Sequence, residues 1–360
     1  MKIEVYSPTI RRKEMDAVLT AMVEDKIGPG DQAKFLIQTA REKIKFDYCL
    51  ALRSPVIALY LALQALNLER GQGVLVSALS PLYYKRVIED LGLVPLYADV
   101  PPAAACLNRE SAEKALASRS EGLDVRAIVL HHTLGFLGDS EGISELGIPL
   151  IEDCSHSYGT YFQMPNADTG GDSSGELPAH IPVGGYGVFT ILGLEERDML
   201  TCGGGALLYA ASRRDAAVLR GFENLPPEYG LPDMNAALAV VQFREAAKNL
   251  VKRREIARQY THSAMRTRHK RFVVPDLEYN NYAFPLILET GVKDVKAYAR
   301  KKDIAVENAF ENTLAASGAF PPEQCPEAYS LSLRTVLFPL YPRLRLSDAE
   351  KIVKLILTLP

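Results

Sequence analysis

The sequence predicts an α/β fold, with a mainly parallel central sheet between helices and a smaller C-terminal α+β domain. Short β-rich runs alternate with helical stretches from about residue 47 to residue 209, which is typical of a parallel sheet with helices on both faces. A chain of 360 residues, 48% apolar and 24% charged, is long enough for one large and one smaller core. We expect the large domain at residues 1–245 and the small one, with a bridging helix, at 246–360.

The elements of the large domain follow this alternation in order. The runs that we assign as strands are CLAL (49–52), GVLVSAL (73–79), VPLYADV (94–100), RAIVLHH (126–132) and IPLIED (148–153). The helical stretches between them are SPVIALYLALQAL (54–66), YYKRVIEDLG (83–92) and the short EGISELG (141–147). Ligands of such a sheet bind at the carboxyl ends of its strands.

The second half begins with a change in composition. Residues 163–185 are rich in Gly, Ser, Asp and Pro and predict a surface loop. GVFTILG (187–193) and GGALLYA (204–210) predict a hairpin-like pair around a charged turn, and a long amphipathic helix is expected from Pro232 to about Ser263. The tail predicts a strand at 282–288, a helix at 292–303, a strand at 334–340 and a closing helix capped by Ser347-Asp348.

Composition and charge argue against several functions. The formal net charge of −3 gives no general attraction to nucleic acid or anionic membranes. We interpret the basic cluster at 248–271 as the solvated face of a helix. The first residues lack the apolar core of a signal peptide, and the apolar run at 56–66 is too short to cross a bilayer. Five scattered cysteines without CxxC spacing indicate free thiols and no metal site. We therefore expect a cytoplasmic protein that binds neither nucleic acid nor membrane.

The segment IEDCSHSYG (151–159) carries the strongest chemical signal. Asp153 ends an apolar strand, and His156 follows three residues later. Asp153 alone could be only a helix N-cap. The functional alternative is a carboxylate that holds a protonated heterocyclic nitrogen, with His156 beside the same ring.

The chain resembles the DegT/StrS family of pyridoxal-phosphate (PLP) sugar aminotransferases, of the fold-type I class, along nearly its whole length. IEDCSHSYG is similar to the family's IEDxxxxxG segment, and LALRSPVIALYLALQAL (50–66) to its SGTxAL helix. LHHTLGFLGD (130–139) is similar to VHLYGxPxD, and residues 328–350 to SLPLxPxLSDEE. The resemblance implies PLP or pyridoxamine phosphate (PMP) as cofactor, and a homodimer whose pocket is built from both subunits.

The resemblance assigns cofactor contacts to three residues. Asp153 matches the carboxylate that pairs with the pyridinium nitrogen, His156 the residue that hydrogen-bonds the ring hydroxyl, and Thr190 a serine that binds the phosphate. The lysine that forms the Schiff base should lie in the charged turn. Counting forward puts its position at Glu195 and counting back from the glycines puts it at Arg197, and no lysine occurs between Lys114 and Lys248. A carboxylate forms no imine, and an arginine stays protonated.

The phosphate cup of the family is altered as well. The family's Gly-Thr at the start of a helix is replaced, because Ser54 is followed by Pro55 and Val56, which remove one amide and one hydroxyl. Glu228 aligns with the asparagine that reaches the phosphate from the partner subunit. Pro81 or Leu79 stands where the family has a stacking aromatic residue, and Tyr83 and Tyr84 nearby are expected only to pack.

Three functions remain open after this comparison. The first is a catalytically inactive homologue without a covalently bound cofactor, a dimeric scaffold that binds a small molecule, a sugar nucleotide or another protein. The second is a lysine-independent PLP or PMP enzyme acting on a nucleotide-linked sugar, with Glu195 as its base. The third is an ordinary transaminase with a lysine from elsewhere. Under the first, we expect Glu195 or Arg197 to fill the imine position, paired with each other or with His156, and Glu228 to approach the partner's Ser54-Pro55 turn.

Overall fold

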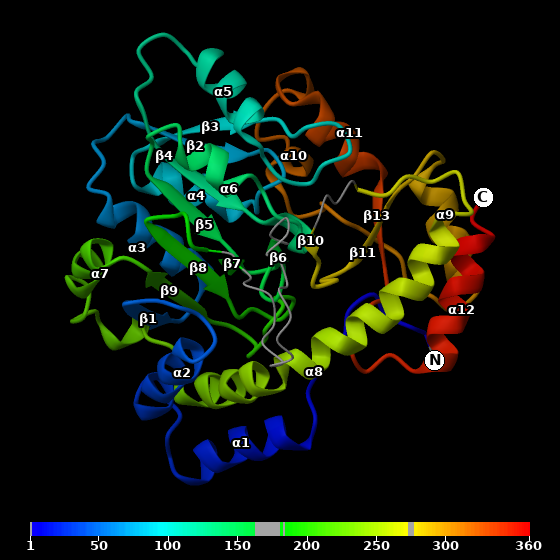
Figure 1. The fold of residues 1–360 in the computed structure, drawn as a ribbon, viewed down its shortest axis with the longest axis horizontal. Helices are drawn as coiled ribbons and strands as arrows, with labels where there is room; N and C mark the ends of the chain where they lie inside the picture. Colours follow the sequence, from blue (N-terminus) through cyan, green and yellow to red (C-terminus); the bar gives the residue numbers. More distant parts are fainter. Residues whose placement is uncertain (1, 163–180, 183, 273–276) are drawn as a thin grey trace, which may run out of the picture.

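A seven-stranded sheet forms the centre of the molecule (Figure 1). The structure is a computed structural model that describes residues 2–162, 181–182, 184–272 and 277–360. The strand order is β1-β9-β8-β5-β4-β2-β3. The strands are β1 (Tyr48–Leu52), β2 (Gly73–Ser77), β3 (Val94–Ala98), β4 (Val125–His131), β5 (Leu150–Asp153), β8 (Phe189–Gly193) and β9 (Ala206–Ala210). Within this sheet β9 alone runs opposite to the direction that the other six strands share, so the predicted mainly parallel α/β sheet and the β8–β9 hairpin-like pair are confirmed.

The alternation along the strands separates two cores on the two faces of this sheet. In β9, Ala206, Leu208 and Ala210 belong to the core that contains helix α3, whereas Leu207 and Tyr209 belong to the core that contains α2 and the start of α8. This is the period of two that a strand buried on both faces requires. The helices of this part are α1 (Arg12–Val23), α2 (Asp31–Arg41), α3 (Pro55–Ala65), α4 (Tyr83–Asp90), α5 (Arg109–Ala117), α6 (Ser140–Ser144) and α7 (Arg213–Arg220).

The C-terminal part forms a separate small sheet with its own core. Antiparallel strands in the order β11-β13-β12 pack against helices, and Ile256, Tyr260 and Ile352 lie in this core together with Ile3 from the chain start. The elements of this part of the chain are β11 (Phe284–Ile287), α9 (Val292–Arg300), β12 (Glu307–Asn308), α10 (Leu314–Ser317), α11 (Pro326–Arg334), β13 (Thr335–Phe338) and α12 (Leu346–Leu357). Of these, α10 and α11 bury Leu314 and Leu331 in the core of the large sheet. The predicted division at 245/246 stays a prediction, because one helix crosses it.

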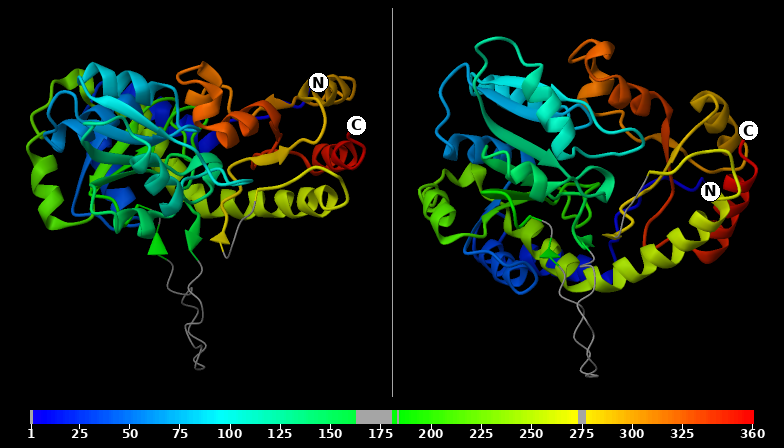
Figure 2. Two further views of the ribbon diagram at one scale, coloured as in Figure 1. Left: turned by 90° about the horizontal axis from the view of Figure 1, so that it is seen from above. Right: turned by 45° about the horizontal axis from the view of Figure 1, so that its top comes forward.

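That helix is α8 (Asp233–Ala264), which agrees with the long helix expected from Pro232 to about Ser263. It passes beneath the large sheet and continues along the C-terminal part (Figure 2). Its first half contributes Ala236, Val240 and Phe243 to the core shared with α2, and its second half contributes Ile256 and Tyr260 to the C-terminal core. The two parts of the chain therefore share one helix.

Two further predictions, the cap of the closing helix and the loop at 163–185, are not confirmed. The closing helix α12 begins at Leu346 after Arg345, without a side-chain cap, so the predicted Ser347-Asp348 cap is wrong; both residues lie inside the first turn. Most of the loop predicted at 163–185 lies outside the described residues. A third small sheet has the order β10-β6-β7, with β6 (Tyr161–Phe162), β7 (Ile181–Pro182) and β10 (Leu277–Glu278). Among the described helices, none combines the length and the hydropathy needed to cross a membrane.

Candidate functional site

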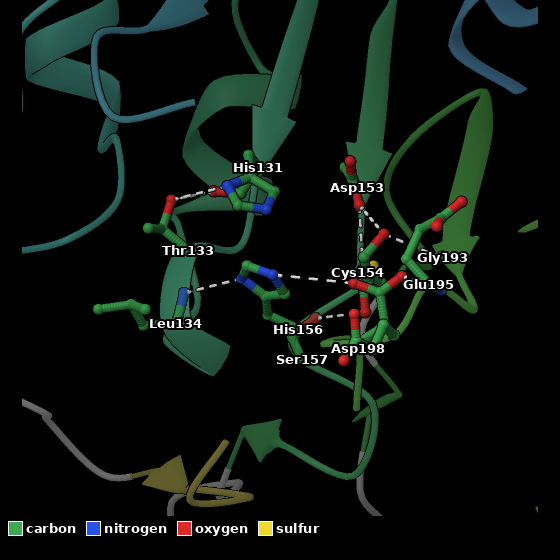
Figure 3. Close-up of polar contacts among 12 residues, drawn as sticks. His131, Thr133, Leu134, Asp153, Cys154, His156, Ser157, Gly193, Glu195 and Asp198 are labelled. Atoms are coloured by element: carbon green, nitrogen blue, oxygen red, sulfur yellow. Dashed lines mark hydrogen bonds and ion pairs between the residues drawn. The ribbon is translucent and has the colours of Figure 1, made fainter. Parts of the chain in front are cut away.

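The carboxyl ends of β4, β5 and β8 bring the candidate site together at one edge of the large sheet. His131 is the last residue of β4 and pairs in register with Asp153, the last residue of β5. Asp153 pairs in turn with Ile191 of β8, which leads into the charged turn at 194–200. Figure 3 shows His131, His156, Asp153 and Asp198 converging on this edge. The placement agrees with the rule that α/β sheets bind ligands at the ends of their strands.

Asp153 is buried and has hydrogen-bond donors on both carboxylate oxygens. Oδ1 accepts from the Ser155 backbone N–H at 3.0 Å and from the Ser155 hydroxyl. Oδ2 accepts from the Tyr84 hydroxyl at 2.6 Å and from the Tyr83 hydroxyl at 3.3 Å. Burial raises the pKa of Asp153, but His131 and the hydrogen bonds from Ser155 and Tyr84 outweigh it and hold the pKa below its usual value. Asp153 is thus an ionised carboxylate satisfied by its own chain.

His156 lies between two rings and carries a defined proton. The Leu134 backbone N–H donates to Nδ1 at 3.3 Å, so the proton of the neutral imidazole lies on Nε2. The ring stacks on Tyr282 with centroids 4.1 Å apart and meets His131 edge-on at 4.9 Å. Burial lowers the pKa of His156 to about 3 and that of His131 to about 4. Both imidazoles are therefore neutral near pH 7.

Asp198, rather than Glu195 or Arg197, is the residue of the charged turn that faces His156. Its Oδ1 lies 3.8 Å from His156 Nε2, beyond hydrogen-bond distance, and its Oδ2 accepts the Glu195 backbone N–H at 2.7 Å. Burial, with smaller contributions from the charges of Asp153 and Glu195, raises the pKa of Asp198 well above its usual value. A carboxyl whose pKa is raised and a neutral imidazole thus lie side by side.

The side chains of Glu195 and Arg197 turn elsewhere, and the predicted pairing is wrong. Arg197 Nη1 forms an ion pair with Glu307 Oε2 at 2.7 Å. The Glu195 carboxylate points away from His156 in Figure 3, and the Gly205 backbone N–H acts to lower its pKa. Partial burial still raises the pKa of Glu195. Neither side chain pairs with the other or with His156, because the tight turn directs each to a different neighbour.

Thr190 is not brought together with Asp153 and His156. In the β5–β8 register its partner is Glu152, so it lies on the opposite face of the sheet from Asp153. Its hydroxyl donates to the Gly184 carbonyl at 2.9 Å. This hydrogen bond engages the hydroxyl proton of Thr190, and its role as a phosphate ligand stays a prediction.

Glu152 fixes the end of β5 from that opposite face. Its Oε1 accepts from Ser140 Oγ at 2.7 Å and lies 3.3 Å from His132 Nε2, and its Oε2 accepts from the backbone N–H groups of Gly187 at 2.7 Å and Tyr186 at 3.0 Å. The side chain is fully buried. Burial raises its pKa, but these donors lower the pKa below the usual value. The carboxylate thereby ties three segments of chain behind Asp153.

The start of α3 is a sound helix N-terminus. Ser54 is the N-cap, its Oγ accepting the Ile57 N–H at 3.3 Å, Pro55 is the first helical residue, and the Val56 side chain is exposed. The Glu228 carbonyl accepts from Arg53 Nε at 2.9 Å, so residues 227–230 lie beside this turn within one chain. The approach of Glu228 to a partner's Ser54-Pro55 turn stays a prediction.

Four residues of this site were missed by sequence reasoning. Tyr83 and Tyr84 were expected only to pack, and both donate to Asp153. The position of His131 at the end of a strand was a sequence signal that could have identified it. Asp198 had no such signal, because it is one of four adjacent charged residues. In the described part of the chain, no group of three or more His, Cys, Asp or Glu side chains is arranged to hold a metal ion.

Comparisons with known proteins agree on the family and the fold. The model of the DegT/DnrJ/EryC1/StrS aminotransferase family matches residues 8–357. L-glutamine:scyllo-inosose aminotransferase from Streptomyces griseus is 30% identical over 165 residues, and the chain spans 34% of that protein with 44% of its own length. TlmJ, an aminotransferase from Streptoalloteichus hindustanus, superimposes with a TM-score of 0.82 at 19% identity, covering 98% of this chain and 97% of TlmJ. Spr1654 from Streptococcus pneumoniae, in its PLP form, gives 0.84 at 17% identity, covering 99% and 98%.

Among these relatives, Spr1654 was solved in a PMP form and in a PLP form. The residues present here do not fit PLP as a lysine-linked ring. No lysine occurs between Lys114 and Lys248, so the turn after β8 offers no amine. The carboxylate at the end of β5 already accepts two phenol hydroxyls from the same chain.

Proposed function

We propose that this chain, which belongs to the DegT/DnrJ/EryC1/StrS aminotransferase family, has lost transamination and acts as a dimeric binding or scaffold protein. The observation that carries the proposal is the state of Asp153, whose Oδ2 accepts from Tyr84 at 2.6 Å and Tyr83 at 3.3 Å. A small molecule or a sugar nucleotide is the class of ligand that the family favours. We place the protein in the cytoplasm.

The chemistry of the turn supports this proposal. Transamination through a Schiff base needs a primary amine, and the turn after β8 presents a carboxylate at residue 195 and a guanidinium at residue 197. Arg197 is held by Glu307, and a guanidinium stays protonated at physiological pH. The covalent step of the family therefore has no nucleophile here.

A second function rests on a different observation. Asp198 and His156 lie 3.8 Å apart at the strand edge, with a raised carboxyl pKa and a lowered imidazole pKa. Groups whose pKa values are driven in this way are a common feature of acid–base sites. This favours a lysine-independent enzyme that uses PLP or PMP and acts on a nucleotide-linked sugar, with Asp198 rather than Glu195 in the acid–base role.

The outer face of α1 supports the proposed homodimer. Met15, Leu19 and Met22 follow one another at helical spacing, and together with Val23 and Ile27 they are more than half exposed. A contiguous apolar stripe on a monomer is typical of an interface. Light scattering at micromolar concentration should give the mass of two chains, and a monomer would contradict the proposal.

One experiment separates the proposed functions. The purified protein is incubated with PLP and with PMP, half of each sample is reduced with borohydride, and intact and native mass spectra are recorded. The first function predicts no covalent adduct, no retained cofactor and no amino transfer from glutamate or glutamine to a keto-sugar nucleotide. Cofactor retained without a covalent adduct would favour the lysine-independent enzyme. A covalent adduct at one residue would overturn both.

A further inference from the structure

The first two residues of α4 seal the carboxylate at the end of β5. The Tyr84 ring is fully buried, and its hydroxyl and that of Tyr83 both donate to Asp153 Oδ2. The two rings meet edge-on, with centroids 5.0 Å apart, and Tyr84 also lies edge-on to His131 at 6.2 Å. The phenols therefore fill the space directly in front of the carboxylate.

The loop that carries this pair is fixed by the C-terminal part. The Ala78 carbonyl accepts from the Ala315 backbone N–H at 2.8 Å, and the Ser80 carbonyl accepts from Leu314 at 3.1 Å. The Leu82 N–H donates to the Asn312 carbonyl at 3.1 Å. These bonds anchor the backbone of residues 78–82, which directly precedes the two tyrosines, to the C-terminal part of the chain.

We propose that Tyr83 and Tyr84 take the place of a heterocyclic ring on Asp153 and are the residues that make the site reject a pyridinium ligand. This inference rests on the proposed loss of transamination and names the residues that enforce it. A carboxylate has about four acceptor positions, and here the two phenols, the Ser155 N–H and the Ser155 hydroxyl are the donors. A ring N–H that reached Asp153 Oδ2 would take the acceptor position of at least one phenol and leave that hydroxyl without this partner. Each lost partner weakens binding by about tenfold to a hundredfold.

The test removes one tyrosine side chain in front of Asp153 and measures whether a small pyridine then binds there. Tyr84→Ala is prepared in the full chain, with Tyr83→Ala as a second variant because Tyr83 is only partly buried. The probe is 4-methylpyridine, which lacks both aldehyde and phosphate, and binding is measured by calorimetry and ligand-observed NMR. We expect the natural protein to show no binding and at least one variant to bind at least tenfold more tightly. Binding should weaken above the pKa of the ring nitrogen and on adding Asp153→Asn.

The matched control is a buried tyrosine whose hydroxyl meets a neutral acceptor. Tyr260 is fully buried and donates to the Pro339 carbonyl at 3.0 Å. The cavity of Tyr260→Ala should bind p-cresol in preference to 4-methylpyridine, whereas Tyr84→Ala should prefer 4-methylpyridine below the pKa of its ring nitrogen.

Two results would overturn the inference. One is binding of 4-methylpyridine by the natural protein as tightly as by the folded variants. The other is a folded Tyr83→Ala or Tyr84→Ala protein, verified by circular dichroism, whose affinity for the ring is unchanged by Asp153→Asn. Neither result touches the proposed function, which is tested separately by covalent adduct formation, cofactor retention, amino transfer and the oligomeric state of the natural protein.

Discussion

Replacing Glu152 with glutamine tests how much the hydrogen bonds of this buried carboxylate contribute to the stability of the protein. Glu152 is fully buried, and each of its oxygens faces two donor groups. The Gly138 N–H donates to His132 Nδ1 at 3.1 Å, so the proton of neutral His132 is on Nε2 and points to Glu152. The amide nitrogen of glutamine must therefore oppose either two backbone N–H groups or one imidazole N–H.

The less unfavourable orientation places the amide nitrogen toward His132 and Ser140, whose hydroxyl can rotate to accept. This orientation loses the hydrogen bond from the His132 N–H to a charged group and sets that N–H against an amide N–H, which together cost about 3 kcal/mol. With an unfolding entropy of about 2.1 cal/mol/K per residue over a chain of this length, Glu152→Gln should lower Tm by about 4 °C. Glu141→Gln, at an exposed position of α6, is the control and should change stability by less than about 0.5 kcal/mol.

The difference in stability between the natural protein and Glu152→Gln should depend on pH in a defined direction. The folded pKa of Glu152 is lowered below the unfolded value, so its contribution is complete above the unfolded pKa of about 4.3 and is lost as pH falls through the folded pKa. Calorimetric melts at several pH values should show the gap between the natural protein and Glu152→Gln narrowing in acid. A variant that melts within about 1 °C of the natural protein at pH 7, on that same entropy scale, would refute the reasoning.

Three further predictions concern the site and α8. Glu195→Lys alone should give no borohydride-trapped adduct with PLP by intact mass, because the turn directs this side chain toward Gly205 and the two phenols still cover Asp153; a trapped adduct at residue 195 would contradict this. The imidazole NMR signals of His131 and His156 should stay those of neutral rings between pH 8 and 5, given pKa values of about 4 and about 3. Their contribution to stability should be lost as pH falls below the unfolded histidine pKa of about 6.5, and a titration midpoint near 6.5 for either ring would show the pKa shift to be wrong. Asn249→Leu should raise the free energy of unfolding by about 1 kcal/mol, because the buried Asn249 Oδ1 has no partner among the described residues; a decrease in denaturant melts would mean that this oxygen is hydrogen-bonded.

The sequence predicted those features that depend on periodicity. Alternating runs indicated the parallel sheet, and the apolar face after Pro232 indicated α8 within one residue at each end. The site depended on less local information. Tyr84 and Asp153 are 69 residues apart in the sequence. Tyrosines at the start of an amphipathic helix give the same sequence pattern whether they only pack or also donate hydrogen bonds.

Two other site features were decided by tertiary geometry. Asp198 is buried although three of its charged neighbours are at least partly exposed, because it accepts the Glu195 N–H and closes the turn inward. Thr190 faces away from Asp153 because of the register between β5 and β8, which aligns it with Glu152. Neither the inward member of a charged turn nor the register of two parallel strands is encoded in a short motif.

The shared helix α8 limits how the molecule can move. Its 32 residues span about 48 Å as one hydrogen-bonded rod, and each half is embedded in a different core. Between those halves, Arg253 Nη1 donates to the carbonyls of Asn281, Tyr282 and Leu340 and clamps the C-terminal part to the rod. A hinge through α8 would have to break the rod itself. Access of a ligand to His156 must therefore come from local displacement of the turns and side chains at the rim, such as Tyr282, and not from a swing of one part of the chain against the other.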